Sequence, residues 1–226
     1  MFLAETEQAA IQRAIPRFLG HSYLALPMLE DPYLLGLSLI FKPELGRNFG
    51  AQIRPTLLLR SVKFSLLLDE MNRIELRYLT SQSSGGRAEI TRVIGSRDVE
   101  TNRWNQLIIT DASSDAQEGA PIDGVNRIVL VTPDKISLDS NHYNSSQLFV
   151  AGIPDVGQIR AGVTERESAS SEDTVGGFVG CIKELQVNSR LYNFRSDLNG
   201  DTLDGFDIGK LKLPSASNAH HLVLSS

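Results

Sequence analysis

The 226-residue sequence predicts an all-β sandwich. From Tyr23 onward, short apolar runs alternate with turn residues, which is typical of consecutive strands. In RIELRY, residues 73–78, apolar and charged side chains alternate, which is the pattern of a half-buried strand. None of the segments between such runs shows a helical pattern of about ten to fifteen residues, as the helix of a βαβ unit would. A parallel α/β sheet is therefore disfavoured.

The predicted strands are rich in leucine, β-branched and aromatic residues. They are residues 22–26, 37–41, 56–59, 63–68, 73–78, 104–109, 126–131, 147–152 and 178–187. Because the turn sequence DEMN separates the fourth strand from the fifth, residues 63–78 predict an antiparallel hairpin with one face on a core. Before the strands, residues 1–15 are rich in alanine, glutamate and glutamine and predict a short amphipathic helix that Pro16 ends.

Polar stretches separate the predicted strands and define the domain limits. Residues 81–87, 111–124 and 160–177 are expected to be surface loops. The stretch after Pro214 has few residues with which to build a core, so we expect a loosely ordered tail over 214–226. With a flanking segment over 1–17, this leaves one domain over residues 18–213.

Composition excludes some partners and leaves the location open. The net charge is −5, from 22 basic and 27 acidic residues, so nucleic acid is not an expected partner. No apolar run approaches the ~20 residues of a membrane-spanning helix. The first residues, MFLAETE, lack the basic start and long apolar core of a signal peptide. The chain is therefore either intracellular or a part of a longer secreted chain.

The single cysteine, Cys181, has four possible roles: nucleophile, metal ligand, small core residue or one half of a disulfide. The histidines are His21, His142, His220 and His221, and no sequence spacing ties one of them to the thiol. No CxxC or HxxxH pattern supports a zinc site. A thiol in an apolar strand is more often an inert core residue than a nucleophile.

Four pieces in order carry a resemblance to a known family. They are FLGHSYLALPML, RIELRY with the Ser/Gly loop that follows it, LFVAGIPD and GGFVGCIKELQVNSRLYNF. Together they resemble a laminin G-like domain, most similar to those of agrin and perlecan, over about residues 18–211. The Gly-Phe-x-Gly-Cys-Ile run is the most specific piece.

The resemblance implies a fold, a location and a class of function. The implied fold is a jelly-roll sandwich of two curved antiparallel sheets. The implied setting is extracellular, in a longer secreted matrix or cell-surface protein. The implied role is a non-catalytic module that binds a cell-surface receptor, a glycan or another matrix protein.

The resemblance also implies a disulfide at Cys181. The family usually joins this cysteine to a second one downstream, here expected around Lys210 and Leu211, where the sequence has none. Cys181 is therefore expected to be one half of a disulfide whose partner is missing.

Calcium is the cofactor that the resemblance implies, at the rim of the sandwich. The acidic position of the first calcium loop is Leu79 here, and leucine cannot coordinate a cation. The second loop offers Asp139, Asn141 and Asn144, of which Asp139 and Asn144 are the candidate ligands. We therefore expect either no cofactor or weakly bound calcium. Asn144-Ser145-Ser146 is also a glycosylation acceptor sequence, and a glycan there would occupy the same rim.

Basic residues cluster in two places, with Arg54, Arg60 and Lys63 in the first and Arg73, Arg77, Arg87 and Arg92 in the second. If the hairpin places Lys63, Arg73 and Arg77 on its outer face, they are candidates for binding sulfated or acidic glycans. The alternative is a solvated strand face with Glu75 among the arginines. Trp104 is expected to be a core residue.

Two other functions remain open besides a binding module. A structural spacer within a larger matrix protein needs no site. A lectin-like, carbohydrate-processing domain needs paired carboxylates across one cleft, for which Asp69-Glu70 and Asp98 with Glu100 are the acidic pairs beside strands.

Overall fold

The computed structural model describes residues 15–27, 31, 33–44, 55–61, 64–80, 89–112, 122–137, 147–152, 159–160, 174–194, 204–206 and 209–211. The regular elements in these ranges are all strands. They are β1 (Ile15–Leu19), β2 (Tyr23–Pro27), β3 (Tyr33–Leu34), β4 (Gly36–Pro43), β5 (Thr56–Arg60), β6 (Phe64–Leu68), β7 (Arg73–Thr80), β8 (Glu89–Asp98) and β9 (Asn105–Asp111). The remaining strands are β10 (Asn126–Thr132), β11 (Ile136–Ser137), β12 (Gln147–Val150), β13 (Ile159–Arg160), β14 (Thr174–Gly177), β15 (Val179–Val187), β16 (Arg190–Leu191), β17 (Asp204–Phe206) and β18 (Gly209–Leu211).

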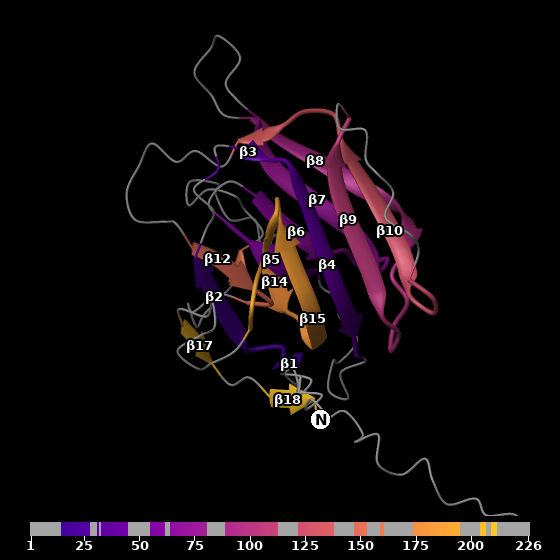
Figure 1. The fold of residues 1–226 in the computed structure, drawn as a ribbon, viewed down its shortest axis with the longest axis vertical. Helices are drawn as coiled ribbons and strands as arrows, with labels where there is room; N and C mark the ends of the chain where they lie inside the picture. The colour runs from indigo at the N-terminus through magenta and orange to yellow at the C-terminus, as the bar shows by residue number, and fades with distance from the viewer. Residues whose placement is uncertain are drawn as a thin grey trace, which may run out of the picture.

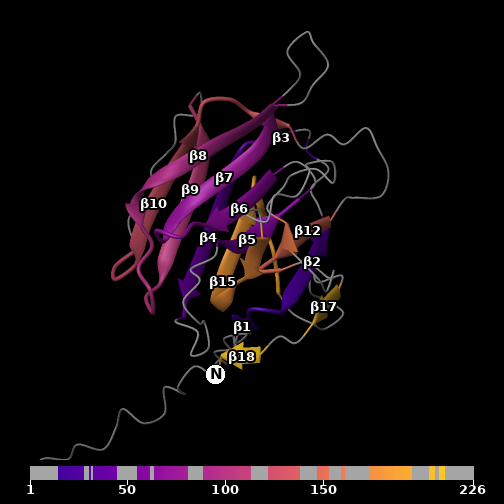
Figure 2. The ribbon, with the colours of Figure 1, turned by 180° about the vertical axis from the view of Figure 1, so that it is seen from behind.

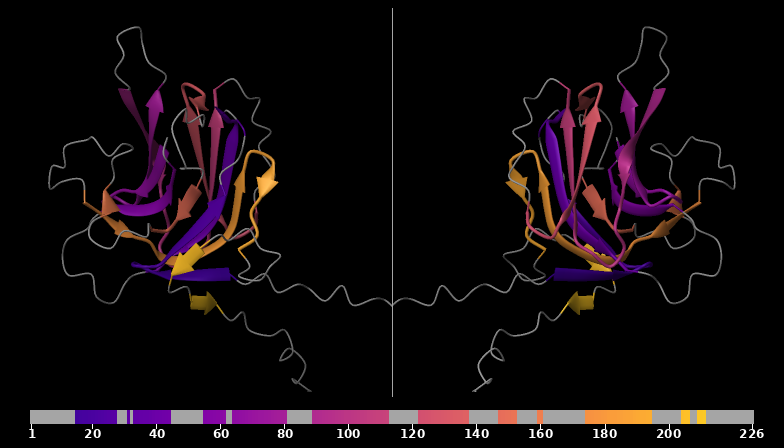
Figure 3. Two further views of the ribbon diagram at one scale, coloured as in Figure 1. Left: turned by 90° about the vertical axis from the view of Figure 1, so that its left-hand side faces the viewer. Right: turned by 90° about the vertical axis from the view of Figure 1, so that its right-hand side faces the viewer.

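Two large sheets form the sandwich (Figures 1 and 2). One has seven strands in the order β10-β9-β4-β15-β1-β18, with β16 paired to β15. The other has nine strands in the order β17-β2-β12-β5-β6-β7-β8, with β14 paired to β5 and β13 paired to β14. Figure 3, seen from the sides, shows the two sheets as curved layers that face each other. The predicted all-β sandwich is confirmed.

The β6–β7 hairpin shows how the sequence pattern builds the core. Ile74, Leu76 and Tyr78 are each 0% exposed and belong to the main hydrophobic cluster, as the alternation in RIELRY predicts. The strands pair antiparallel, with Phe64 opposite Tyr78 and Leu68 opposite Ile74. The hairpin therefore has one face on the core and leaves its charged positions for the outer face.

The segment with the cysteine forms the centre of the seven-stranded sheet. Strand β15 pairs with β4 on one side and with β1 on the other. Phe178 packs against Phe18 and Phe41, with ring centroids 6.4 and 6.2 Å apart. Gly180 lies so close to the backbone of β4 that an added Cβ would collide with the carbonyl oxygen of Lys42. The glycines beside the cysteine therefore mark a close approach of two backbones, as the sequence predicts.

The N-terminal prediction needs correction. Residue 15, predicted to end a helix, begins strand β1 instead, and Ile15 is 4% exposed. Its backbone pairs with Leu211, while Arg17 pairs with Cys181 on the other side. Sheet pairing at both edges of β1 outweighs the local helical composition, so the domain includes residues before 18. Residues 1–14 and the predicted tail lie outside the described residues.

Three further features differ from the sequence-based expectations. Strand β8 was missed, although it is ten residues long. Two strand pairs, β9 with β10 and β5 with β14, are parallel, so the sheets are mainly rather than wholly antiparallel. Strand β14 also lies at the end of the stretch 160–177, which the sequence predicts to be a loop.

Candidate functional site

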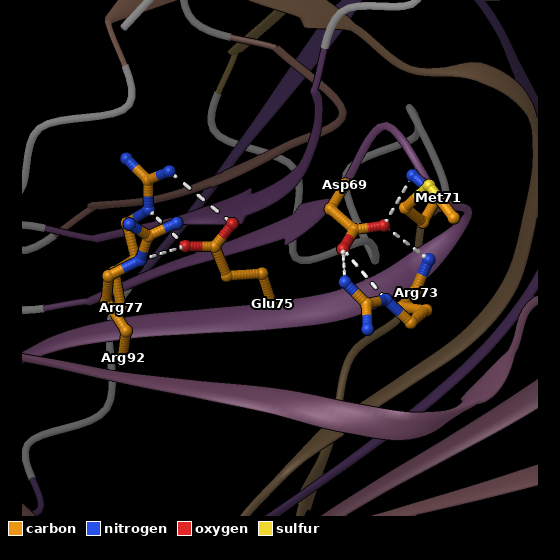
Figure 4. Close-up of polar contacts among 6 residues, drawn as sticks. All are labelled: Asp69, Met71, Arg73, Glu75, Arg77 and Arg92. Atoms are coloured by element: carbon orange, nitrogen blue, oxygen red, sulfur yellow. Dashed lines mark hydrogen bonds and ion pairs between the residues drawn. The ribbon is translucent and has the colours of Figure 1, made fainter.

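A carboxylate fixes the turn of the β6–β7 hairpin (Figure 4). Asp69 Oδ1 accepts the backbone N–H groups of Met71 and Arg73 at 2.8 and 2.7 Å. Its Oδ2 accepts Nε and Nη2 of the Arg73 guanidinium at 3.1 and 3.0 Å. Asn72 adopts a positive φ of 58°, which asparagine tolerates better than most residues. The Asp69 side chain is therefore committed to the turn, and Arg73 is held there with it.

A second carboxylate, Glu75, is buried on the outer face of the same strand. The residue is 2% exposed, and its Oε1 lies 2.7 Å from Nε of Arg77 and 2.6 Å from Nε of Arg92. Figure 4 shows both guanidinium groups on the same side of the carboxylate. Burial alone would raise the pKa of the Glu75 carboxyl, but the hydrogen bonds and charges of the two arginines outweigh it and hold that pKa below its usual value. Glu75 therefore stays ionised and fixes both arginines.

Strand register extends this pair into a row across the nine-stranded sheet. Arg60 on β5 lies opposite Ser65 on β6, Ser65 lies opposite Arg77 on β7, and Arg77 lies opposite Arg92 on β8. Partners in register point to the same face and lie about 5 Å apart. The row Arg60–Arg77–Arg92, called the arginine row below, thus places three guanidinium-bearing residues on one face beside Glu75. Of the two arginines that Glu75 binds, Arg92 is the more exposed, with 57% of its side chain accessible against 14% for Arg77.

The structure separates the three residues predicted to bind glycans. Arg77 lies in the arginine row, whereas Arg73 belongs to the turn and forms an ion pair with Asp69. Lys63 lies outside the described residues. The burial of Glu75 and Arg77 also shows that this part of the hairpin is not a solvated strand face. Sequence reasoning placed Arg92 in the same basic cluster as Arg77 but did not count it among the glycan-binding candidates, because its position opposite Arg77 depends on strand β8.

Cys181 is a free, buried thiol. It lies on the outer face of the seven-stranded sheet, between Arg17 on β1 and Lys42 on β4. Glu44 covers it: Arg17 binds Glu44 at 2.7 Å, and the thiol donates to Glu44 Oε1 at 3.7 Å. Burial, together with the negative charge of Glu44, raises the pKa of the thiol to about 11. The thiol therefore stays protonated at neutral pH and is a poor nucleophile.

The register also bears on the missing disulfide. Arg17 pairs with Cys181 on one side and with Gly209 on the other. A residue on β18 is therefore two strands from Cys181, or about 10 Å. A disulfide needs Cα atoms within about 7 Å. A cysteine at Lys210 or Leu211 would be too far away in this arrangement.

Trp104 is half-buried at the surface rather than in the core. The ammonium group of Lys42 lies 5.6 Å from the centre of its ring, a cation–π contact. Asn105, the next residue, is 0% exposed and takes the inward position. Its side chain bonds the backbone of Glu100 and Arg103, which fixes the start of β9.

The predicted calcium and glycosylation residues, Asp139 and Asn144, lie outside the described residues, so both assignments stay predictions. Leu79, at the end of β7, is half-buried. Among the described residues, no group of three or more histidine, cysteine, aspartate or glutamate side chains could hold a metal ion. Within the same ranges, no helix has the length and apolar character needed to cross a membrane.

No family model matches the sequence. Among solved structures, the chain is similar to the LG1-3 region of the laminin alpha2 chain, with a TM-score of 0.50 and 15% sequence identity. The match covers 88% of this chain and 34% of that one. A second match is to domains LG4-5 of the mouse laminin alpha1 chain, with a TM-score of 0.42 and 17% identity, covering 93% of this chain and 51% of that one.

The fold is that of a laminin G-like domain. The two sheets, their mainly antiparallel pairing and the likeness to the LG1-3 region agree on this point. The chain spans about a third to a half of the length of the laminin structures that it matches. The closer similarity to agrin and perlecan, predicted from the motifs, stays a prediction.

Proposed function

We propose that the chain is a non-catalytic, extracellular binding module of a longer matrix or cell-surface protein, and that the arginine row binds a sulfated or acidic glycan. The laminin G-like fold supports the extracellular setting and the class of function. The ligand is proposed from this chain's own residues, because one fold hosts many partners.

The observation that carries the proposal is that one buried carboxylate forms hydrogen-bonded ion pairs with two arginines. Glu75 holds Arg77 and Arg92 at 2.7 and 2.6 Å, so their guanidinium planes are fixed before a ligand arrives. A fixed guanidinium loses little side-chain entropy on binding and presents paired donors to sulfate or carboxylate groups. A row of arginines at strand spacing suits a chain of anionic sugars.

The acidic pairs considered for a carbohydrate-processing enzyme favour the binding module instead. Asp69 accepts four hydrogen bonds within its own turn, from two backbone N–H groups and the Arg73 guanidinium. Glu100 forms an exposed ion pair with Arg103 at 3.1 Å. A catalytic carboxylate must reach the substrate within hydrogen-bond distance, and both oxygens of Asp69 are already bonded within the turn.

Heparin-affinity chromatography tests the proposal with a matched pair of variants. Arg92→Gln removes the charge of the more exposed of the two arginines that Glu75 binds. Arg103→Gln removes an exposed charge from the loop before β9. We expect Arg92→Gln to elute at clearly lower salt than the unmodified chain, because the loss of one contact between an arginine and a sulfate group lowers the affinity for heparin. Arg103→Gln should elute with the unmodified chain.

Two outcomes would contradict the proposal. Equal elution of the two variants would show that retention reflects general charge rather than the arginine row. No retention of the unmodified chain on heparin, together with no signal on a glycan array, would favour a protein receptor or a spacer role.

A further inference from the structure

Strand β8 carries a large bulge opposite the start of β7. Arg73 pairs with Asp98 and Glu75 pairs with Ile94, so the single residue Ile74 faces three residues, Gly95 to Arg97. Bulges occur at sheet edges and re-aim the side chains that they carry. Because β8 is the last strand of its sheet, this bulge turns residues toward the other sheet.

The bulge reaches β10, the edge strand of the seven-stranded sheet. A Cβ on Gly95 would lie 3.8 Å from Cγ2 of Ile128, so the bulge packs against the Ile128 side chain. Arg97 donates from Nη1 to the carbonyl oxygen of Arg127 at 3.4 Å. Asn126 donates from Nδ2 to the carbonyl oxygen of Asp98 at 3.1 Å. These polar bridges hold the edges of the two sheets together on the side of the sandwich that carries β8 and β10 (Figure 1).

A groove of about 280 Å³ lies at this junction, lined by Ser96, Arg97, Arg127 and Val129. Among the residues that the structure describes, this lining includes two arginines and one serine and no acidic residue. Val129, one of the lining residues, is 39% exposed, and Val131, two residues further along β10, is 50% exposed. The groove therefore combines two positively charged residues with apolar surface along β10.

We propose that this groove binds an extended acidic peptide segment of a partner protein. A carboxylate of the segment lies between Arg97 and Arg127, where guanidinium groups match it in charge and in geometry. Apolar side chains next to that carboxylate in the segment cover Val129 and Val131. A sulfated or acidic glycan has no aliphatic side chains to cover the two valines, which is why the groove is assigned to a peptide and the arginine row to a glycan. The site is separate from the one proposed above and goes beyond it.

Fluorescence anisotropy with two capped, labelled octapeptides tests the assignment. One peptide alternates valine with glutamate and the other alternates valine with glutamine. We expect the unmodified chain to bind the glutamate peptide and to bind the glutamine peptide about tenfold more weakly, the effect of about 1.4 kcal/mol. Arg97→Gln should also lower the affinity for the glutamate peptide by about tenfold, because a charge-assisted hydrogen bond is lost.

Ser96→Asp provides a second variant, which places a negative charge in the groove at an exposed position. It should abolish discrimination in favour of the glutamate peptide, while Arg103→Gln should bind like the unmodified chain. Thermal melts confirm that each variant is folded. The proposal is overturned if the unmodified chain does not distinguish the peptides, or if Arg97→Gln and Ser96→Asp bind as the control does. Arg92→Gln should leave peptide binding unchanged, so failure here is distinguishable from failure of the glycan proposal.

Discussion

The carbonyl oxygen of Lys42 occupies the space that a Cβ on Gly180 would need, and Gly180 has a φ of +146°. Replacement by alanine therefore forces β4 and β15 apart at the centre of their sheet. We expect Gly180→Ala to lower the free energy of unfolding by about 3 kcal/mol or more. Gly36→Ala is the control, because a Cβ there would lie 3.7 Å from the carbonyl oxygen of Ile109, an ordinary contact. Urea unfolding measures both, and equal stabilities would show that the backbones are not so close.

Glu75→Gln keeps the size of the side chain and removes the charge that holds Arg77 and Arg92. We expect a loss of about 2 kcal/mol in the free energy of unfolding at pH 7, because both partners lose a charge-assisted bond. Glu100→Gln, at a position where 46% of the side chain is exposed, should cost less than about 1 kcal/mol.

The effect of Glu75 should depend on pH. Its pKa in the folded chain lies below the ordinary value of 4.5, so the stabilisation is present above that value and is lost as the pH falls through the folded pKa. The difference between the unmodified chain and Glu75→Gln should therefore shrink between neutral pH and about pH 3. A difference that stays constant over this range would contradict the ionised, arginine-bound state.

Cys181 should react slowly with thiol reagents. Its pKa is raised to about 11 and the side chain is buried, so labelling at pH 8 should be slow in the folded chain and fast in urea. Glu44→Gln should speed labelling of the folded chain, because it removes a negative charge and leaves Arg17 and Lys42 beside the sulfur. Fast labelling of the unmodified, folded chain would reopen a role as a nucleophile.

Asn188 joins the turn after β15 to the segment before β4. Its Oδ1 accepts the backbone N–H of Leu35 at 2.8 Å, and its Nδ2 donates to Asp31 and to the carbonyl oxygen of Tyr33 at 2.8 and 3.0 Å. It also has a positive φ of 53°. Asn188→Gly loses only the side-chain bonds and should cost about 1 to 2 kcal/mol. Asn188→Ala adds backbone strain and should cost about 1 kcal/mol more. Thermal melts that rank alanine above glycine would contradict this account.

The strands that the sequence predicts correctly are those in which the pattern of apolar and polar residues indicates which side chains are buried. The alternation of RIELRY and the leucines of β5 and β6 are local signals, and the structure buries them as expected. Strand β8 gave no such signal, because the bulge at Gly95 to Arg97 breaks the period of two. Strand β1 was not predicted, because the sequence before it has a composition typical of a helix and only its pairing with β15 and β18 makes it a strand.

The candidate site was predictable only in part. The sequence indicates that Arg77 lies on the outer face of a hairpin, because its neighbours alternate with apolar residues. It does not indicate that Arg60 and Arg92 lie in the same row, since that depends on register across four strands. The same limit applies to Cys181, whose apolar neighbours suggested a core position rather than one beneath the Arg17–Glu44 ion pair.

The pairing of β1 with β18 has a mechanical consequence. Ile15 and Leu211 are direct partners at the same end of an antiparallel ladder, followed by Pro16 with Lys210 and Arg17 with Gly209. A pulling force applied at Ile15 and Leu211 acts in the unzipping geometry, in which the hydrogen bonds between the two strands break one after another. In a shear geometry they would bear the force together. Under tension, β18 should therefore leave the sheet at low force while the rest of the sandwich stays folded.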